Sequence, residues 1–171
     1  MDLIEMVPYE ITNERKARFD DWATNLIHDD AQDVRNDLIH FTPLARRLSE
    51  SRVALVSTGG LRLASQDAFD VLKSDGDWTI RAIPSETPRD DLRIDHTHYN
   101  HGDADDDVNC MFPIDRVRDL VSMGFVGGVT ETFFGMMGFI PNGHHLVDEA
   151  GPEIAQRLKA EGADIVVLTP S

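Results

Sequence analysis

Short apolar runs, separated by amphipathic segments and glycines, define the second part of the chain. Residues 53–58 (VALVST) form a continuous β-branched run of the kind buried on both faces of a parallel sheet. Residues 164–169 (DIVVLT) have the same character and predict a central strand. Residues 148–160 have helical periodicity and are followed by Gly162, a typical helix stop. The residues of this helix predicted to face inward are Ile154, Ala155 and Leu158.

Weaker patterns complete the predicted domain. They indicate strands at residues 78–84, 92–94 and 125–130 and a helix at residues 114–123. Residues 132–140 (TFFGMMGFI) are apolar with two glycines, which is compatible with a loop over a site or with a very closely packed helix. Together these patterns predict an α/β fold with a parallel, flavodoxin- or Rossmann-like sheet and flanking helices.

The first part of the chain is predicted to be different. No strand pattern precedes Arg52, and residues 1–49 are amphipathic and helical in character. A second short helix is plausible at residues 31–39. We therefore expect a helical arm at residues 1–49 and an α/β domain at residues 50–171. The apolar face of the first helix is formed by Phe19, Trp22, Ala23, Leu26 and Ile27.

Composition narrows the function. The chain of 171 residues has 16 Lys and Arg against 31 Asp and Glu, a formal net charge of −15, so nucleic acid is a poor partner. A single cysteine excludes an intrachain disulfide framework and suits a reducing compartment. The sequence has no signal-peptide pattern and no apolar run long enough to span a membrane. We expect a soluble, cytoplasmic protein.

Candidate chemistry concentrates in residues 90–118. His96, His98 and His101 lie within six residues, just after the predicted strand at 92–94, where α/β sheets place their sites. Such a pair of imidazoles suits acid–base work or substrate positioning, and a metal site or a hydrogen-bonded polar loop are the alternatives. The spacing matches no strong structural-zinc pattern, so we assign no metal.

Three neighbouring motifs have simpler structural interpretations. Gly59-Gly60 fits a tight turn after the first strand better than a phosphate loop, because it lacks the nucleotide-binding patterns. The acidic run at residues 103–107 fits a solvated loop better than a calcium site. Cys110 has apolar neighbours, which favours packing over a nucleophilic role.

Six ordered pieces of the chain carry a family resemblance, which runs from about Phe41 to the C-terminus. The pieces are SESRVALVSTGGL (49–61), DWTIRAIPSET (77–87), DLRIDHTHYN (91–100), NCMFPIDRVRDL (109–120), GFIPN (138–142) and ADIVVLTPS (163–171). Together they resemble the glycine/sarcosine/betaine/D-proline reductase family of selenoprotein B type. The likeness is greatest to its D-proline-reductase-like branch.

The resemblance implies an oxidoreductase that cleaves a C–N bond reductively. In the family, a selenocysteine or cysteine attacks the substrate carbon, and a thiol or selenol protein regenerates it and becomes a disulfide, which is the acceptor when the reaction is written in the oxidative direction. Some members work with a partner subunit that carries a pyruvoyl group, whereas this chain itself is expected to hold no cofactor. A small amino-acid-like or amine substrate is implied.

The family's nucleophile follows a strand that ends like residues 168–171, and this chain stops one residue before it. We therefore expect an incomplete domain, cut where a UGA selenocysteine codon was read as a stop. A naturally split gene and a shortened binding or scaffold subunit are the alternatives. An exposed sheet edge at Ser171 would favour association with another chain.

Position alone suggests the site residues. His96 and His98 are expected to act as acid–base or carboxylate-binding groups. Thr58, Gly59, Thr97 and Tyr99 are expected to line the substrate site. The competing hypothesis is a non-catalytic α/β module that binds a small ligand or a metal through the His96/His98 loop.

Overall fold

The structure is a computed structural model that describes residues 42–141 and 143–170. The predicted helix with the apolar face from Phe19 to Ile27 and the short helix predicted at residues 31–39 lie outside the described residues. The first described element is the single 3-10 turn η1 (Leu48–Glu50). The division of the chain at residue 49 stays a prediction.

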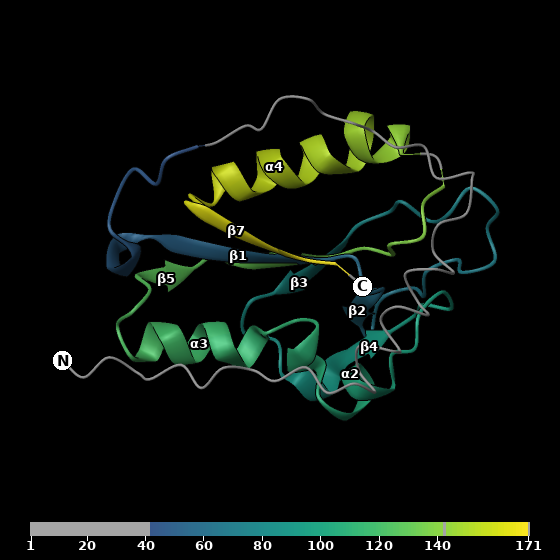
Figure 1. Cartoon of the computed structure of the whole chain (residues 1–171), viewed down its shortest axis with the longest axis horizontal. Coiled ribbons are helices and arrows are strands. Elements are labelled where there is room, and N and C mark those ends of the chain that lie inside the picture. Colours follow the sequence, from purple (N-terminus) through teal and green to yellow (C-terminus); the bar gives the residue numbers. More distant parts are fainter. Residues whose placement is uncertain (1–41, 142, 171) are drawn as a thin grey trace, which may run out of the picture. The chain divides into compact units, whose positions relative to one another are not determined.

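A five-stranded sheet organises the described residues (Figure 1). Strand β1 (Arg52–Ser57) lies in its interior, and β7 (Ile165–Thr169) runs parallel to it over five paired residues. On the opposite side, β5 (Gly128–Val129) pairs with the start of β1 and β6 (Thr132–Gly135) with its end, both parallel. Strand β3 (Arg81–Pro84) is antiparallel to β6. The predicted α/β class is confirmed, with a sheet that is mixed but mostly parallel.

Two helices cover the sheet. Figure 1 shows α4 (Gly151–Ala160) on one face and α3 (Ile114–Ser122) on the other. Both helices were predicted, and each ends before a glycine with positive φ, Gly124 or Gly162. Helix α4 buries Ile154 and Leu158, whereas Ala155, predicted to face inward, is exposed. Because the two layers bury β1 on both faces, its apolar run is the centre of the core.

A separate two-stranded sheet carries the histidine-rich segment. Strand β4 (Leu92–Ile94) follows the 3-10 turn η2 (Arg89–Asp91) and pairs antiparallel with β2 (Leu61–Leu63). The brief strand at residues 92–94 is therefore confirmed, but it lies outside the parallel sheet in which the prediction placed it. Because β2 follows β1 after only three residues, this small sheet stands directly beyond the carboxyl end of β1.

Short helical segments complete the fold. The acidic run predicted as a loop forms the single helical turn α2 (Gly102–Asp106), whose acidic residues are exposed as expected. The 3-10 turn η3 (Val108–Cys110) leads into α3, and the π-helical turn η4 (Leu146–Ala150) leads into α4. Within the described part of the chain, no helix is long and apolar enough to cross a membrane.

The apolar run at residues 132–140 begins as strand β6, not as the loop or helix that we considered. Phe133 and Phe134 are fully buried between the sheet and its covering layers. A side chain at Gly135 would put its Cβ 2.0 Å from the carbonyl oxygen of Leu61. The glycine therefore serves a close approach of β6 to β2, which composition alone did not separate from helix packing.

Strand β7 departs furthest from its predicted environment. Its sequence is typical of a central strand, yet Val166, Val167 and Leu168 are exposed, Leu168 to 70%. Among the described residues, β7 pairs with β1 alone, so its second edge faces no other strand. Valine and leucine runs of this kind normally fill the interior of a sheet.

Candidate functional site

The candidate site forms where two turns meet beyond the carboxyl end of β1. Gly60 has φ of 73° and accepts a hydrogen bond from the Asp95 amide at 2.9 Å. A Cβ at Gly60 would lie 2.2 Å from the Asp95 carbonyl oxygen, so only glycine permits this contact. The turn after β1 thereby fixes the position of the histidine-rich loop that follows β4.

Tyr99 ties the far end of the loop to the same turn. Its hydroxyl donates to the Gly59 carbonyl oxygen at 3.0 Å and lies 2.9 Å from the Met111 sulfur. Burial, with smaller effects of Asp105 and Cys110, raises the pKa of Tyr99 to about 12. The phenol therefore stays protonated at neutral pH and acts as an anchoring donor.

The two candidate histidines lie in different environments. His96 is buried with 6% of its surface exposed, whereas His98 is exposed and its ring stacks on Phe139 at 3.6 Å and 6°. Their ring centroids are 5.8 Å apart and nearly perpendicular. The two rings therefore do not form a parallel pair, because the residues after Ile94 have left the extended conformation.

The protonation state of His96 bears on its role. Burial, followed by the nearby His98 and His101, lowers the pKa of His96 to about 4. The imidazole is then neutral at pH 7 and a weak base. This environment suits hydrogen bonding better than proton transfer, which were the two roles that the sequence left open.

The other predicted site residues gather around the same turns. The Thr58 amide donates to the Thr169 carbonyl at 3.2 Å, which joins the turn after β1 to the end of β7. Thr97 is exposed, and its hydroxyl lies 3.2 Å from His98 Nδ1. All six predicted residues thus belong to two adjacent turns, while their roles toward a ligand stay predictions. The six are Thr58, Gly59, His96, Thr97, His98 and Tyr99.

An ion pair beneath the loop had no signal in the sequence. Arg62 on β2 contacts both carboxylate oxygens of Asp95, and the Phe69 amide donates to the same carboxylate at 3.1 Å. Both charged side chains are mostly shielded from solvent. The hydrogen bond with Asp95 raises the pKa of Arg62 above its usual value. The pair fixes the residue directly before His96.

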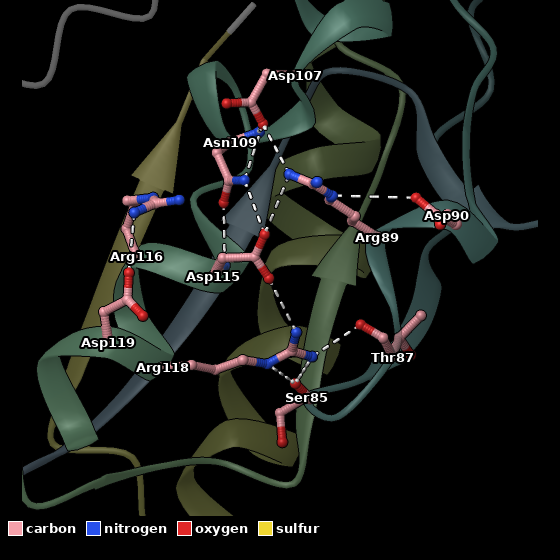
Figure 2. Close-up of polar contacts among 10 residues, drawn as sticks. All are labelled: Ser85, Thr87, Arg89, Asp90, Asp107, Asn109, Asp115, Arg116, Arg118 and Asp119. Atoms are coloured by element: carbon pink, nitrogen blue, oxygen red, sulfur yellow. Dashed lines mark hydrogen bonds and ion pairs between the residues drawn. The ribbon is translucent and has the colours of Figure 1, made fainter.

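A second polar network holds the acidic segment in place (Figure 2). The Arg118 guanidinium donates to the carbonyl oxygens of Ser85 and Thr87 and to Asp115. Asn109 donates to Asp115 at 3.0 Å and accepts from its amide. The network links α3 to the loop after β3. We interpret it as structural.

The expectation that Cys110 is packed in the core is wrong. Its side chain is exposed rather than packed among apolar neighbours, because η3 turns it outward. Partial desolvation, then Asp103 and Asp107, raises the pKa of the thiol. A raised pKa reduces the thiolate fraction and hence nucleophilicity at neutral pH. Among residues 42–141 and 143–170, no three His, Cys, Asp or Glu side chains form a cluster that could hold a metal ion.

Comparison with known proteins identifies the class. The chain matches the family described as glycine/sarcosine/betaine reductase selenoprotein B over residues 24–171, and it belongs to that family. Its similarity to a D-proline reductase subunit supports the D-proline-like branch. No solved structure matches the chain.

Two curated relatives illustrate the relationship. The D-proline reductase subunit gamma of Acetoanaerobium sticklandii is 37% identical over 129 residues, which cover 75% of this chain and 52% of that protein. The glycine reductase complex component B subunit gamma of Carboxydothermus hydrogenoformans is 28% identical over 142 residues, or 78% of this chain and 31% of that protein. The chain therefore spans about half and about a third of the length of these relatives.

Proposed function

We propose that this chain supplies the front half of a reductase subunit that cleaves the C–N bond of a small amino acid. The observation that carries the proposal is the meeting of the β1 turn, the histidine loop and the end of β7. Thr58 bonds Thr169 at 3.2 Å and Gly59 bonds Tyr99 at 3.0 Å. A nucleophile placed directly after β7 would therefore stand beside the His96–Tyr99 loop.

The proposed chemistry needs a selenocysteine or cysteine that follows residue 171. Its selenolate or thiolate attacks the carbon that bears the nitrogen, so a carbon–selenium or carbon–sulfur bond forms while the C–N bond breaks and the amine takes a proton. A reductant thiolate then attacks the selenium or sulfur, and the carbon leaves with the bonding electrons and takes a proton. The second thiol of the reductant resolves the resulting bridge to a disulfide. Two electrons pass from dithiol to substrate.

Family membership supports a complex of several subunits, in line with the names of the relatives, which are subunits of reductases. A partner that carries a pyruvoyl group would activate the substrate amine. A dithiol or selenol protein of the reducing cytoplasm would deliver the electrons.

Within the part of the chain that the structure describes, β7 pairs with β1 alone, and its other edge suits the rest of the catalytic unit. An additional parallel strand would hydrogen-bond to it and cover Val166 and Leu168. The relatives are longer than the matched region, so a protein of their length has enough residues to form this additional strand. Leu168→Lys should leave the folding of this chain unchanged and prevent association with the second half. Leu72→Lys is the matched control, because Leu72 is 90% exposed elsewhere on the surface.

The first test of the proposal is to sequence the gene through the codon that follows Ser171 and onward. An in-frame UGA or cysteine codon, followed by a helix pattern, is expected. The full-length protein should then open the ring of D-proline with a dithiol donor, while the 171-residue chain should not. A UAA or UAG codon with no open frame beyond it, and no second gene for the missing half, would overturn the proposal.

A further inference from the structure

The tautomer of His96 follows from its backbone contact. The amide of His98 donates to His96 Nδ1 at 3.1 Å. A ring nitrogen that accepts a hydrogen bond carries no proton, so in the neutral imidazole the proton lies on Nε2. The lowered pKa of about 4 keeps the ring neutral at pH 7. His96 therefore presents one N–H donor on its Nε2 side.

That donor has no partner within the described residues. Nε2 of His96 is buried and makes no hydrogen bond to any described residue. Only 6% of the surface of His96 is exposed to solvent. The Tyr99 ring meets the imidazole edge-on with centroids 4.6 Å apart, which restricts rotation away from this position. A buried donor without a partner destabilises the fold, and such groups are rare in folded proteins.

The two carbonyl groups of the nearest turn bind other donors and make no hydrogen bond to Nε2. The Gly59 carbonyl accepts from Tyr99, and the Gly60 carbonyl accepts from Asp95. An acceptor from outside these residues would complete the hydrogen bond. The acceptor must offer a lone pair to an N–H group, as a carbonyl or carboxylate oxygen does.

A metal ion is the wrong occupant for this nitrogen. Coordination through Nε2 would move the proton to Nδ1. Nδ1–H would then face the His98 amide N–H at 3.1 Å, so that two donors would oppose each other. The same contact that fixes the tautomer therefore disfavours metal binding and favours an oxygen acceptor.

We infer that His96 is a substrate-binding residue that donates its Nε2–H to a carboxylate oxygen of the amino-acid substrate. The inference rests on the proposed function for the identity of the substrate. A hydrogen bond to a carboxylate is charge-assisted and stronger than one to a neutral oxygen. Amino acids that differ at nitrogen share this carboxylate, so one donor would serve a class of substrates.

The tautomer can be measured on the 171-residue chain. Nitrogen-15 NMR of labelled histidine at pH 7 should report a protonated Nε2 and an unprotonated Nδ1 for His96. A proton on Nδ1, or an imidazolium, would overturn the inference.

Binding then tests the ligand class, with D-proline and pyrrolidine as probes. D-proline should shift the His96 Nε2 resonance, and pyrrolidine, which lacks the carboxylate, should not. His96→Phe should weaken D-proline binding at least tenfold, while His96→Gln, which keeps an N–H donor, should lose less. His101→Gln is the matched control, since that ring pairs with Asp105 at 2.7 Å and should leave binding unchanged.

Equal binding of the two probes, unchanged binding by His96→Phe, or no binding of D-proline would each overturn the inference. These readouts need no turnover. Carboxylate-dependent binding in a full-length protein that fails to reduce D-proline would therefore refute the proposed function and leave the role of His96 intact.

Discussion

Replacement of Gly60 by alanine should disrupt the junction between the turn after β1 and the histidine loop. The added Cβ would lie 2.2 Å from the Asp95 carbonyl oxygen, whereas contacts below 3.0 Å are essentially never seen. The backbone at Asp95 must then retreat by at least about 0.8 Å, the difference between these two distances. Because His96 follows directly, the loop must move with it.

The expected loss of stability has two parts. The left-handed conformation, φ of 73°, costs an alanine about 1–2 kcal/mol. Relief of the backbone clash costs about 1–3 kcal/mol more, as for overpacked sites. Gly60→Ala should therefore lower the free energy of unfolding by about 3 kcal/mol.

Gly162→Ala supplies the control. Gly162 has φ of 75° and nothing within 4 Å of the added Cβ, so only the same conformational cost of about 1–2 kcal/mol applies. The unfolded-state entropy change is common to both alanines and cancels in the comparison. Urea denaturation of the two variants gives the difference, expected near 2 kcal/mol. Equal stabilities within about 0.5 kcal/mol would refute the close approach of Gly60 to Asp95.

Three further predictions concern the same loop and the network of Figure 2. Asp95→Asn should cost about 2 kcal/mol in urea denaturation, because it removes a shielded charge from its arginine partner; a loss below 0.5 kcal/mol would contradict this. Arg118→Lys should lower the free energy of unfolding by about 1–2 kcal/mol, because an ammonium group cannot contact the two carbonyl oxygens of Ser85 and Thr87 in the same way. Arg116→Lys is the control, because Arg116 forms an exposed ion pair and its replacement should leave the free energy of unfolding nearly unchanged. His96 has a folded pKa of about 4 against 6.5, so the unfolded state binds more protons between these values and stability falls as pH decreases through this window. Between pH 7 and pH 5, wild type should lose about 2 kcal/mol more than His96→Gln, and identical pH profiles would show that the ring is not held neutral.

Local sequence signals predicted the elements but not their neighbours. Strand β1 and helices α3 and α4 follow from continuous apolar runs, helical periodicity and terminal glycines, all of which act within a few residues. The edge position of β7 was missed because a buried-type run does not say which strands will flank it. The strand β6 was missed because phenylalanines and glycines also suit a packed helix.

The candidate site was found in part for the same reason. The turn at Gly59-Gly60 and the histidine loop stand out by composition, and the structure brings them together. The burial of His96 and the exposure of His98 depend on where the chain leaves the strand after Ile94. The ion pair between Arg62 and Asp95 joins residues 33 positions apart, and no local pattern marks such a partner.

The pairing of β1 with β7 also limits how early the sheet can form during synthesis. Ser57 and Thr169, paired at the carboxyl ends of these strands, are 112 residues apart in the chain. At about 5–20 residues per second, the ribosome needs roughly 6–22 s to make the intervening segment. During that interval β1 lacks its partner strand β7, which pairs with it over five residues. Contacts between segments so far apart in the chain also form slowly. The nascent chain therefore exposes the strand that becomes the centre of the core for seconds, so we expect chaperone binding and aggregation during synthesis to involve β1.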